Sequence, residues 1–242
     1  MKKISFLFLL ILLCLSVFGQ VSIGPKAGVN ISKNRNDKYG GKSTDNRSVI
    51  GYNFGLVVHY WFSDNFVFQP EISYIQRGNQ NIRTIFDDST SNYTERKFTE
   101  KYNLLEVPLL IKYITGDKIK LNAIVGPAFS INTGGRYKLE MQTIDEYHSG
   151  KIRFGQKPEN YTGDNLYMNP DYVTRFYYGF YVGLGLSKQV GRGKLMADAR
   201  FGLNSYTSFK DGSQSEGYIQ LFNKSFQILF FYVFDLNSST KN

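Results

Sequence analysis

The alternation of side chains between Gly51 and Gln76 constrains the fold more than any other feature of the sequence. Two runs flank the polar break Ser63-Asp64-Asn65, and in each run large apolar residues alternate with small or polar ones. A repeat of two places successive side chains on opposite faces of a β-strand. Two such runs joined by a short polar turn predict a β-hairpin with one bulky apolar face and one small, polar face.

The same alternation recurs along the whole chain after residue 20. It predicts eight strands, at residues 21–32, 51–62, 66–76, 102–115, 119–131, 174–189, 194–206 and 224–234. Turns of three or four residues are expected after the second, fourth and sixth strands, and long polar loops after the others, at residues 33–48, 76–101, 133–173 and 207–223. Residues 133–173 are expected to hold a hairpin that extends beyond the main sheet and breaks at residues 148–150. This strict alternation places every short turn at one end of the sheet.

The direction of the two faces follows from the size of their side chains. The interior of a small barrel has room for few side chains, so the small, polar face suits the inside and the bulky apolar face points outward. Water does not favour such an exterior but lipid does, and closure of the sheet pairs every backbone polar group. We therefore predict an all-β protein, an eight-stranded antiparallel up-and-down transmembrane β-barrel over residues 20–234, with a polar tail at 235–242. A soluble barrel that binds a ligand in an apolar interior is the alternative.

The first 19 residues have the pattern of a cleaved secretory signal peptide. Lys2 and Lys3 precede the apolar run Phe6 to Leu15, which is too short to span a bilayer. An uncleaved N-terminal membrane anchor is the alternative interpretation. The single cysteine, Cys14, lies inside this segment, so the mature chain is predicted to form no disulfide and no cysteine-ligated metal site.

Four stretches of the sequence resemble a known family, the PorT-like small outer-membrane β-barrel proteins of Bacteroidetes. They are GPKAGVN (24–30), SDNFVFQPEISYIQRG (63–78), NLLEVPLLIKY (103–113) and AIVGPAF (123–129). The resemblance runs over essentially the whole mature chain. It implies a location in the cell outer membrane, periplasmic termini and long loops at the cell surface. Members are linked to protein secretion or to adhesion, or have no known role, and the resemblance does not choose among these.

Charged residues on the inward face are the candidate functional residues. Charges in a narrow lumen must be paired, because an isolated ion is costly to bury. We predict a structural polar network that fills the barrel, because eight strands leave room inside for side chains alone. The alternative is a narrow porin-like channel for ions or small solutes. The predicted network residues are Lys26, His59, Glu71, Glu106, Lys112, Lys120, Asp198 and Arg200.

The sequence carries no strong signature of catalysis. His59 has Val57 and Trp61 as its same-face neighbours, and His148 lies beside Ser149 without the His-x-Ser spacing of lipid A deacylases. We therefore predict that the protein is not an enzyme and has no catalytic residues. A barrel enzyme acting on lipid or peptide is the weaker alternative.

Asp145, Glu146 and His148 are the one group that resembles a set of metal ligands. Three residues in a single predicted loop are a weak metal signature, so we predict neither metal nor cofactor. The formal charge of +9 has two interpretations, ordinary solvated loop charge and attraction to anionic lipid headgroups. No nucleic-acid-binding motif is present. The predicted partners are outer-membrane lipid and lipopolysaccharide, and a protein partner at the surface loops is a further hypothesis.

Overall fold

A closed ring of eight antiparallel strands forms the body of the molecule, as a computed structural model shows. The structure describes residues 20–34, 45–87, 92–141, 146–155, 163–168, 175–210 and 218–236. The predicted signal peptide, residues 1–19, and residues 237–242 of the predicted tail lie outside these ranges. The ring strands are β1 (Gln20–Asn34), β3 (Val49–Trp61), β4 (Phe66–Asp87), β5 (Asn92–Thr115), β6 (Lys120–Met141), β9 (Phe176–Val190), β10 (Gly193–Lys210) and β11 (Tyr218–Asp235).

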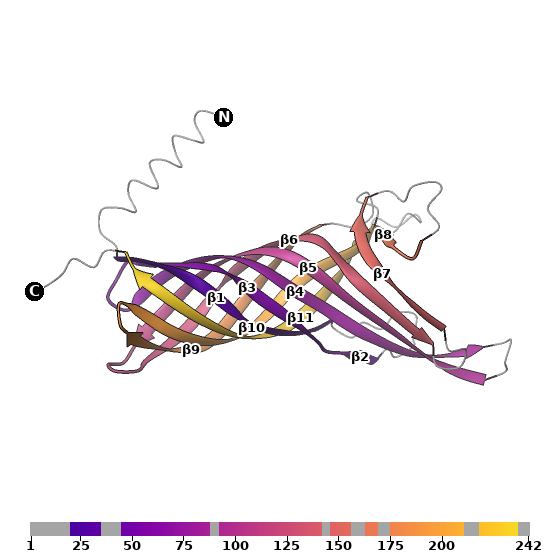
Figure 1. Cartoon of the computed structure of the whole chain (residues 1–242), viewed down its shortest axis with the longest axis horizontal. Coiled ribbons are helices and arrows are strands. Elements are labelled where there is room, and N and C mark those ends of the chain that lie inside the picture. Colours follow the sequence, from indigo (N-terminus) through magenta and orange to yellow (C-terminus); the bar gives the residue numbers. More distant parts are fainter. Residues whose placement is uncertain are drawn as a thin grey trace, which may run out of the picture.

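Strands that follow one another in the ring also follow one another in the chain (Figure 1). The order is β1-β3-β4-β5-β6-β9-β10-β11, and every interface is antiparallel. β11 then returns to β1, with Lys26 opposite Phe231 and Ile31 opposite Phe226. The prediction of an eight-stranded antiparallel up-and-down barrel is therefore confirmed.

Short turns occupy one end of the barrel, at the left of Figure 1. They join β3 to β4, β5 to β6 and β9 to β10, in the places that the sequence predicted. Gly116 and Gly191 lie in two of these turns with φ of 105° and 60°. Such left-handed backbone suits glycine because it has no Cβ. The described ends of β1 and β11 lie at the same end of the barrel.

The wall continues beyond the ring at the opposite end, and here the prediction of a polar loop at residues 76–101 is wrong. β4 and β5 remain paired from Gln76 opposite Asn103 to Asp87 opposite Asn92. This segment lies beyond the lipid-facing band, so its strands carry polar residues on both faces and lose the alternation that marks a strand at a lipid boundary. Similarly, β10 and β11 reach into the predicted loop at 207–223.

Three further strands complete this extension of the wall. They are β2 (Asp45–Arg47), which pairs with β4, β7 (Glu146–Phe154), which pairs with β6, and β8 (Leu166–Met168), which runs parallel to β7. The predicted hairpin within residues 133–173 is thus present as β6 and β7. Its predicted break at 148–150 is wrong, because those residues lie inside β7, with Gly150 opposite Tyr137. Below, "the extension" means β2, β7, β8 and the parts of β4, β5 and β6 beyond the ring.

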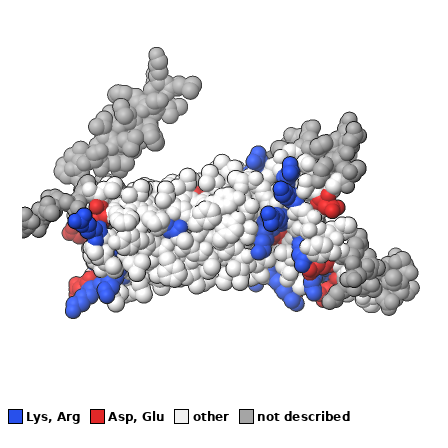
Figure 2. Space-filling model, viewed as in Figure 1, with Lys and Arg blue, Asp and Glu red and all other residues white. Residues whose placement is uncertain are grey.

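A band of apolar side chains covers the outside of the ring. Phe54 and Leu184 are 51% and 70% exposed on this surface. In Figure 2 the band is almost free of charge, and charged residues gather at its two ends. Along β3 the band runs from Tyr52 to Phe62, the residue that follows the strand, a span of about 33 Å. At a tilt of about 40° this is roughly 25 Å along the barrel axis, the height of the lipid-facing band in outer-membrane barrels.

Polar and small residues fill the inside, as the alternation predicted. The interior also holds three small apolar clusters, of which one joins Val57, Met196 and Phe231. Between these clusters lie buried serines, asparagines and charged residues. Within the described residues, no helix combines the length and apolar character that crossing a membrane demands.

Candidate functional site: the charged interior of the barrel

A cluster of five charged side chains crosses the middle of the lumen. Glu71 on β4 accepts hydrogen bonds from both terminal nitrogens of Arg200 on β10, at 2.8 and 3.1 Å. Lys26 on β1 donates to the same carboxylate. Asp198 accepts from Arg200 at 2.7 Å and from the ammonium group of Lys112 on β5 at 2.8 and 3.0 Å. We call these five residues the central cluster.

Strand register and small neighbours bring the central cluster together. Every member lies at an inward position of its strand, and the five come from four strands around the ring. Arg200 pairs with Gly183 and Asp198 pairs with Gly185 on β9. A Cβ at Gly183 would lie 3.0 Å from Cγ of Arg200, and one at Gly185 would clash with the Asp198 carboxylate. Glycine at these positions leaves the space that the long charged side chains occupy.

A second charged group lies nearer to the extension. Arg77 on β4 donates to Glu106 on β5 and to the hydroxyl oxygen of Tyr181 on β9. Glu106 also accepts hydrogen bonds from the Tyr181 hydroxyl at 2.9 Å and from Ser130 on β6 at 2.9 Å. Gln227 on β11 donates to the Tyr181 oxygen at 2.7 Å. This second cluster therefore spans the lumen from β4 to β11.

Sequence reasoning placed most of these groups inside but missed Arg77. The polar neighbours of Arg77 predict a loop, although Arg77 continues the inward positions Ser73 and Ile75 of the same strand. Extending the two-residue repeat past Gln76 would have found it. Tyr181 has the inward parity of its strand, but the residue type alone gives no sign that its hydroxyl joins an ion pair.

The structure buries seven of the eight predicted network residues inside the barrel and leaves the eighth exposed at its rim. Five form the central cluster, and Glu106 belongs to the second cluster. His59 is fully buried, but neither ring nitrogen has a hydrogen-bond partner among the described residues. Lys120 lies at an inward position of β6, opposite the buried Ser187, but it takes part in neither cluster. Its side chain is exposed at the rim, 5.9 Å from the ring centroid of Trp61, because the first residue of β6 lies where the wall meets water.

The central cluster is a set of ion-paired side chains away from water, three cations with two carboxylates. Glu71, Lys26, Lys112, Asp198 and Arg200 have side-chain exposures of 0%. An ion that is removed from water costs several kcal/mol unless a partner and hydrogen bonds replace its hydration. Each carboxylate here accepts from two different cations, so its lone pairs are used within the protein. Chemically, this arrangement fixes side chains across the lumen and leaves no charged group presented to a solute.

Two carboxyl groups at the ends of the barrel have shifted pKa values. At the extension end, burial raises the pKa of Glu100 and outweighs the hydrogen bonds from Tyr102 and Asn34. At the turn end, partial burial raises the pKa of Asp235, but hydrogen bonds from Ser22 at 2.6 Å and Lys194 at 2.9 Å outweigh it and lower that pKa. Both groups lie outside the apolar band.

The weak metal candidate is only partly visible. Asp145 lies outside the described residues, whereas Glu146 and His148 lie on β7. His148 Nδ1 is 3.9 Å from a carboxylate oxygen of Asp164. In the described ranges, no three histidine, cysteine, aspartate or glutamate side chains gather as metal ligands would.

A closed strand ring with an apolar exterior and an ion-paired interior defines the class of transmembrane β-barrels. A family model described as the outer membrane protein beta-barrel domain matches residues 18–235. The chain belongs to this family. The protein is therefore located in the outer membrane, which implies an environment of lipid and lipopolysaccharide.

Solved structures with a similar course of the chain share little sequence with it. Ail, the attachment invasion locus protein of Yersinia pestis, is 13% identical, with coverage of 89% of this chain and 99% of Ail and a TM-score of 0.37. OprG of Pseudomonas aeruginosa is 11% identical, with coverage of 89% and 96% and a TM-score of 0.41. The outer membrane protease OmpT of Escherichia coli is 10% identical, with coverage of 90% and 96% and a TM-score of 0.40. A comparison with curated proteins gave no match.

Proposed function

We propose that this protein is a closed outer-membrane barrel that holds a binding surface at the cell exterior and does not conduct solutes. The observation that carries the proposal is the central cluster, whose side chains cross the lumen at 0% exposure. The second cluster blocks the lumen again, nearer to the extension. A permeating ion would have to break both sets of hydrogen bonds.

The space at the lumen mouth agrees with a closed barrel. A hollow lined by Asn34, Glu100, Tyr102, Asn132 and Asn204 holds about 20 Å³. This is close to the volume that one water molecule needs. The hollow ends at Arg77, which is ion-paired with Glu106. The small volume of this hollow supports a lumen that is closed at this end.

Planar-bilayer recording of the refolded protein tests closure. We expect no steady unitary conductance from protein whose folding is verified by a mobility difference between unboiled and boiled samples on a gel. A variant that combines Arg200→Ala, Lys112→Ala and Tyr181→Ala removes long side chains from both clusters and is expected to admit ions, which shows that the assay can detect an open lumen. Steady unitary conductance of the unmodified protein would establish the narrow-channel alternative instead.

The orientation of the barrel is part of the proposal. Residues 1–19 act as a cleaved signal peptide, the short turns and both termini face the periplasm, and the extension stands at the cell surface. The support is the segregation of turns and long strands at opposite ends. Trypsin added to intact cells should cut the Lys- and Arg-containing extension, and the mature chain should begin at Gln20. Protection of the extension from trypsin in intact cells would indicate the opposite orientation.

The role of the extension is binding rather than catalysis. His59 is enclosed by the wall, and His148 Nδ1 lies 3.9 Å from a carboxylate oxygen of Asp164. The resemblance to PorT-like barrels supports a link to protein secretion, in which the extension contacts another protein. Deletion of the gene should then change the set of secreted proteins, and His59→Ala and His148→Ala should leave secretion unaltered. An unchanged secretome would remove the secretion role, and loss of an enzymatic activity in either histidine variant would remove the non-catalytic one.

A further inference from the structure

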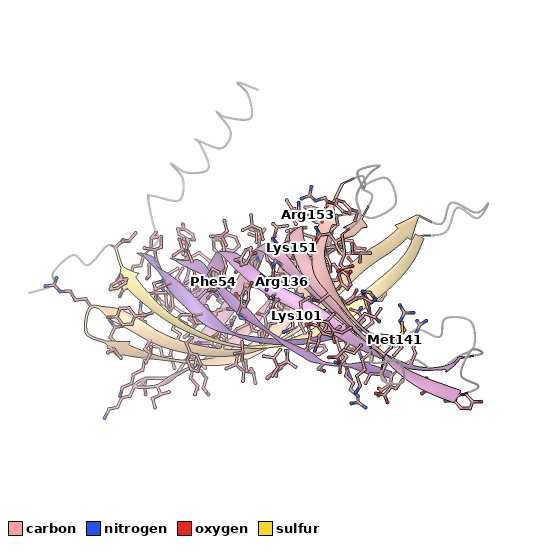
Figure 3. All side chains as sticks on the ribbon, turned by 45° about the vertical axis from the view of Figure 1, so that its right-hand side comes forward. Phe54, Lys101, Arg136, Met141, Lys151 and Arg153 are labelled. Atoms are coloured by element: carbon pink, nitrogen blue, oxygen red, sulfur yellow. The ribbon has the colours of Figure 1, made fainter. Side chains whose placement is uncertain are left out.

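Three cations stand side by side on the outer wall, where the ring meets the extension. Lys101 on β5 is directly opposite Arg136 on β6, and Arg136 is directly opposite Lys151 on β7. Side chains of directly opposite residues share a face, with Cβ atoms about 4.5–5.5 Å apart. Figure 3 shows the three labelled side chains in one row. We call Lys101, Arg136 and Lys151 the basic strip.

The charge of the basic strip is not neutralised by the protein. None of its three residues forms an ion pair within the part of the chain that the structure describes. Neighbouring carboxylates on these strands have other partners, since Glu140 pairs with Lys138 and Glu95 pairs with Lys97. Like charges directly opposite each other destabilise a sheet. An anion from outside the protein would relieve this repulsion.

The height of the basic strip indicates which anion is available. Lys101 lies four residues beyond Leu105, which faces lipid, and two beyond Asn103, whose side-chain oxygen accepts from the Tyr52 hydroxyl at 3.2 Å. Two residues advance about 7 Å along a strand, or roughly 5 Å along the axis of a tilted barrel. The strip therefore lies just above the aromatic boundary of the apolar band, at the level of lipid headgroups.

The surroundings of the strip suit a phosphate group. The strip lines an open hollow of about 560 Å³ together with Lys138 and the hydroxyl-bearing residues Thr99 and Ser149. A guanidinium group binds phosphate oxygens through two parallel hydrogen bonds, and lysines add point charges beside it. Hydroxyl groups supply further donors.

We propose that the basic strip binds the phosphate groups of a phosphorylated glycolipid of the outer leaflet. The acyl chains of that lipid lie along the apolar wall immediately below, at Leu105 and Ile131. A free phosphate ion would meet the same cations but would gain nothing from this wall. The inference rests on the proposed orientation, which places the extension at the cell surface, and it is independent of whether the lumen conducts.

Native mass spectrometry of the refolded full-length protein in detergent micelles tests the proposal. The probes are diphosphoryl lipid A, the same lipid without phosphate, and inorganic phosphate. The test variant carries Lys101→Gln, Arg136→Gln and Lys151→Gln. The matched control carries Lys118→Gln, Lys188→Gln and Arg192→Gln, which removes the same charge from exposed positions at the turn end.

We expect the unmodified protein and the control to retain diphosphoryl lipid A, and the test variant to bind it about fivefold more weakly for each charge removed. Single Arg136→Gln and Lys151→Gln variants carry the test if the triple variant does not fold, because both side chains are exposed. Equal retention of the dephosphorylated lipid would overturn the proposal. So would tight binding of inorganic phosphate alone, equal losses in test and control, or unchanged binding in the folded test variants. A barrel that fails this test but remains closed in planar bilayers refutes the lipid site and not the proposed function.

Discussion

Replacement of Glu71 by glutamine tests whether the central cluster stabilises the barrel. The Glu71 carboxylate accepts from Lys26, from Gln69 and from both terminal nitrogens of Arg200. An amide has the same shape, but it turns one acceptor into a donor that faces other donors. The substitution also leaves the three cations of the cluster with Asp198 as their sole carboxylate. Removing one partner of a buried ion pair costs about 3–5 kcal/mol, so we expect a loss of about 4 kcal/mol in the free energy of unfolding.

Urea titration of the protein refolded into lipid vesicles measures this loss. Trp61 is the single tryptophan of the chain and lies at the rim, so its fluorescence reports unfolding. Glu140→Gln is the matched control, because its carboxylate pairs with Lys138 in water and should contribute less than about 1 kcal/mol. The double variant Glu71→Gln, Arg200→Met removes the excess cation as well. Its loss in the free energy of unfolding should be smaller than the sum of the two single losses by at least about 1 kcal/mol. A loss below about 1 kcal/mol for Glu71→Gln would refute the reasoning.

Three further substitutions have expected outcomes in the same unfolding assay. Burial raises the pKa of Glu100 above the unfolded value of about 4.3, so its cost to stability is absent at low pH and grows as pH rises. The free energy of unfolding of Glu100→Gln, relative to that of the unmodified protein, should therefore increase between pH 4 and pH 7. A difference that stays constant with pH would contradict this. Gly185→Ala places a methyl group against the Asp198 carboxylate and should cost about 1–3 kcal/mol, whereas an unchanged urea midpoint would show that the lumen has spare room. Lys120→Gln should change stability by less than about 0.5 kcal/mol, because this exposed ammonium contacts the Trp61 ring alone among the described aromatic rings; a larger loss would indicate that Lys120 contributes to the polar network.

The sequence was sufficient for the ring because lipid and lumen impose opposite demands on alternate residues. Tyr52, Phe54 and Leu56 face outward while Asn53 and Val57 face inward, so period two is visible in the residue types themselves. The sequence predicted well where each ring strand ends on the side of the short turns, because the alternation stops there at glycine or at polar turn residues. It predicted poorly where the strands end on the side of the extension.

The extension was missed because strands beyond the lipid-facing band carry no such contrast. Arg77 and Asn79 point inward while Gln76 and Gln80 lie opposite, and all four are polar. Backbone pairing holds these residues in strands, and backbone pairing leaves no mark on residue type. Inward charge alone predicted the members of the central cluster but not which of them pair. The two-residue repeat along one strand does not say which residues of distant strands lie at the same height in the lumen. The basic strip depends on cross-strand register in the same way.

The pairing of β1 with β11 sets a condition on how the protein reaches its native state. These strands come from opposite ends of the described chain, with Ser22 opposite Asp235 and Asn34 opposite Asn223. Until β11 arrives, β1 has an unbonded edge, and each unpaired backbone group in hydrocarbon costs several kcal/mol. Contacts of such long sequence separation form slowly, since most of the chain must be ordered before they are made. We therefore expect insertion to be cooperative, because any intermediate that lacks β11 leaves the edge of β1 unpaired in the bilayer.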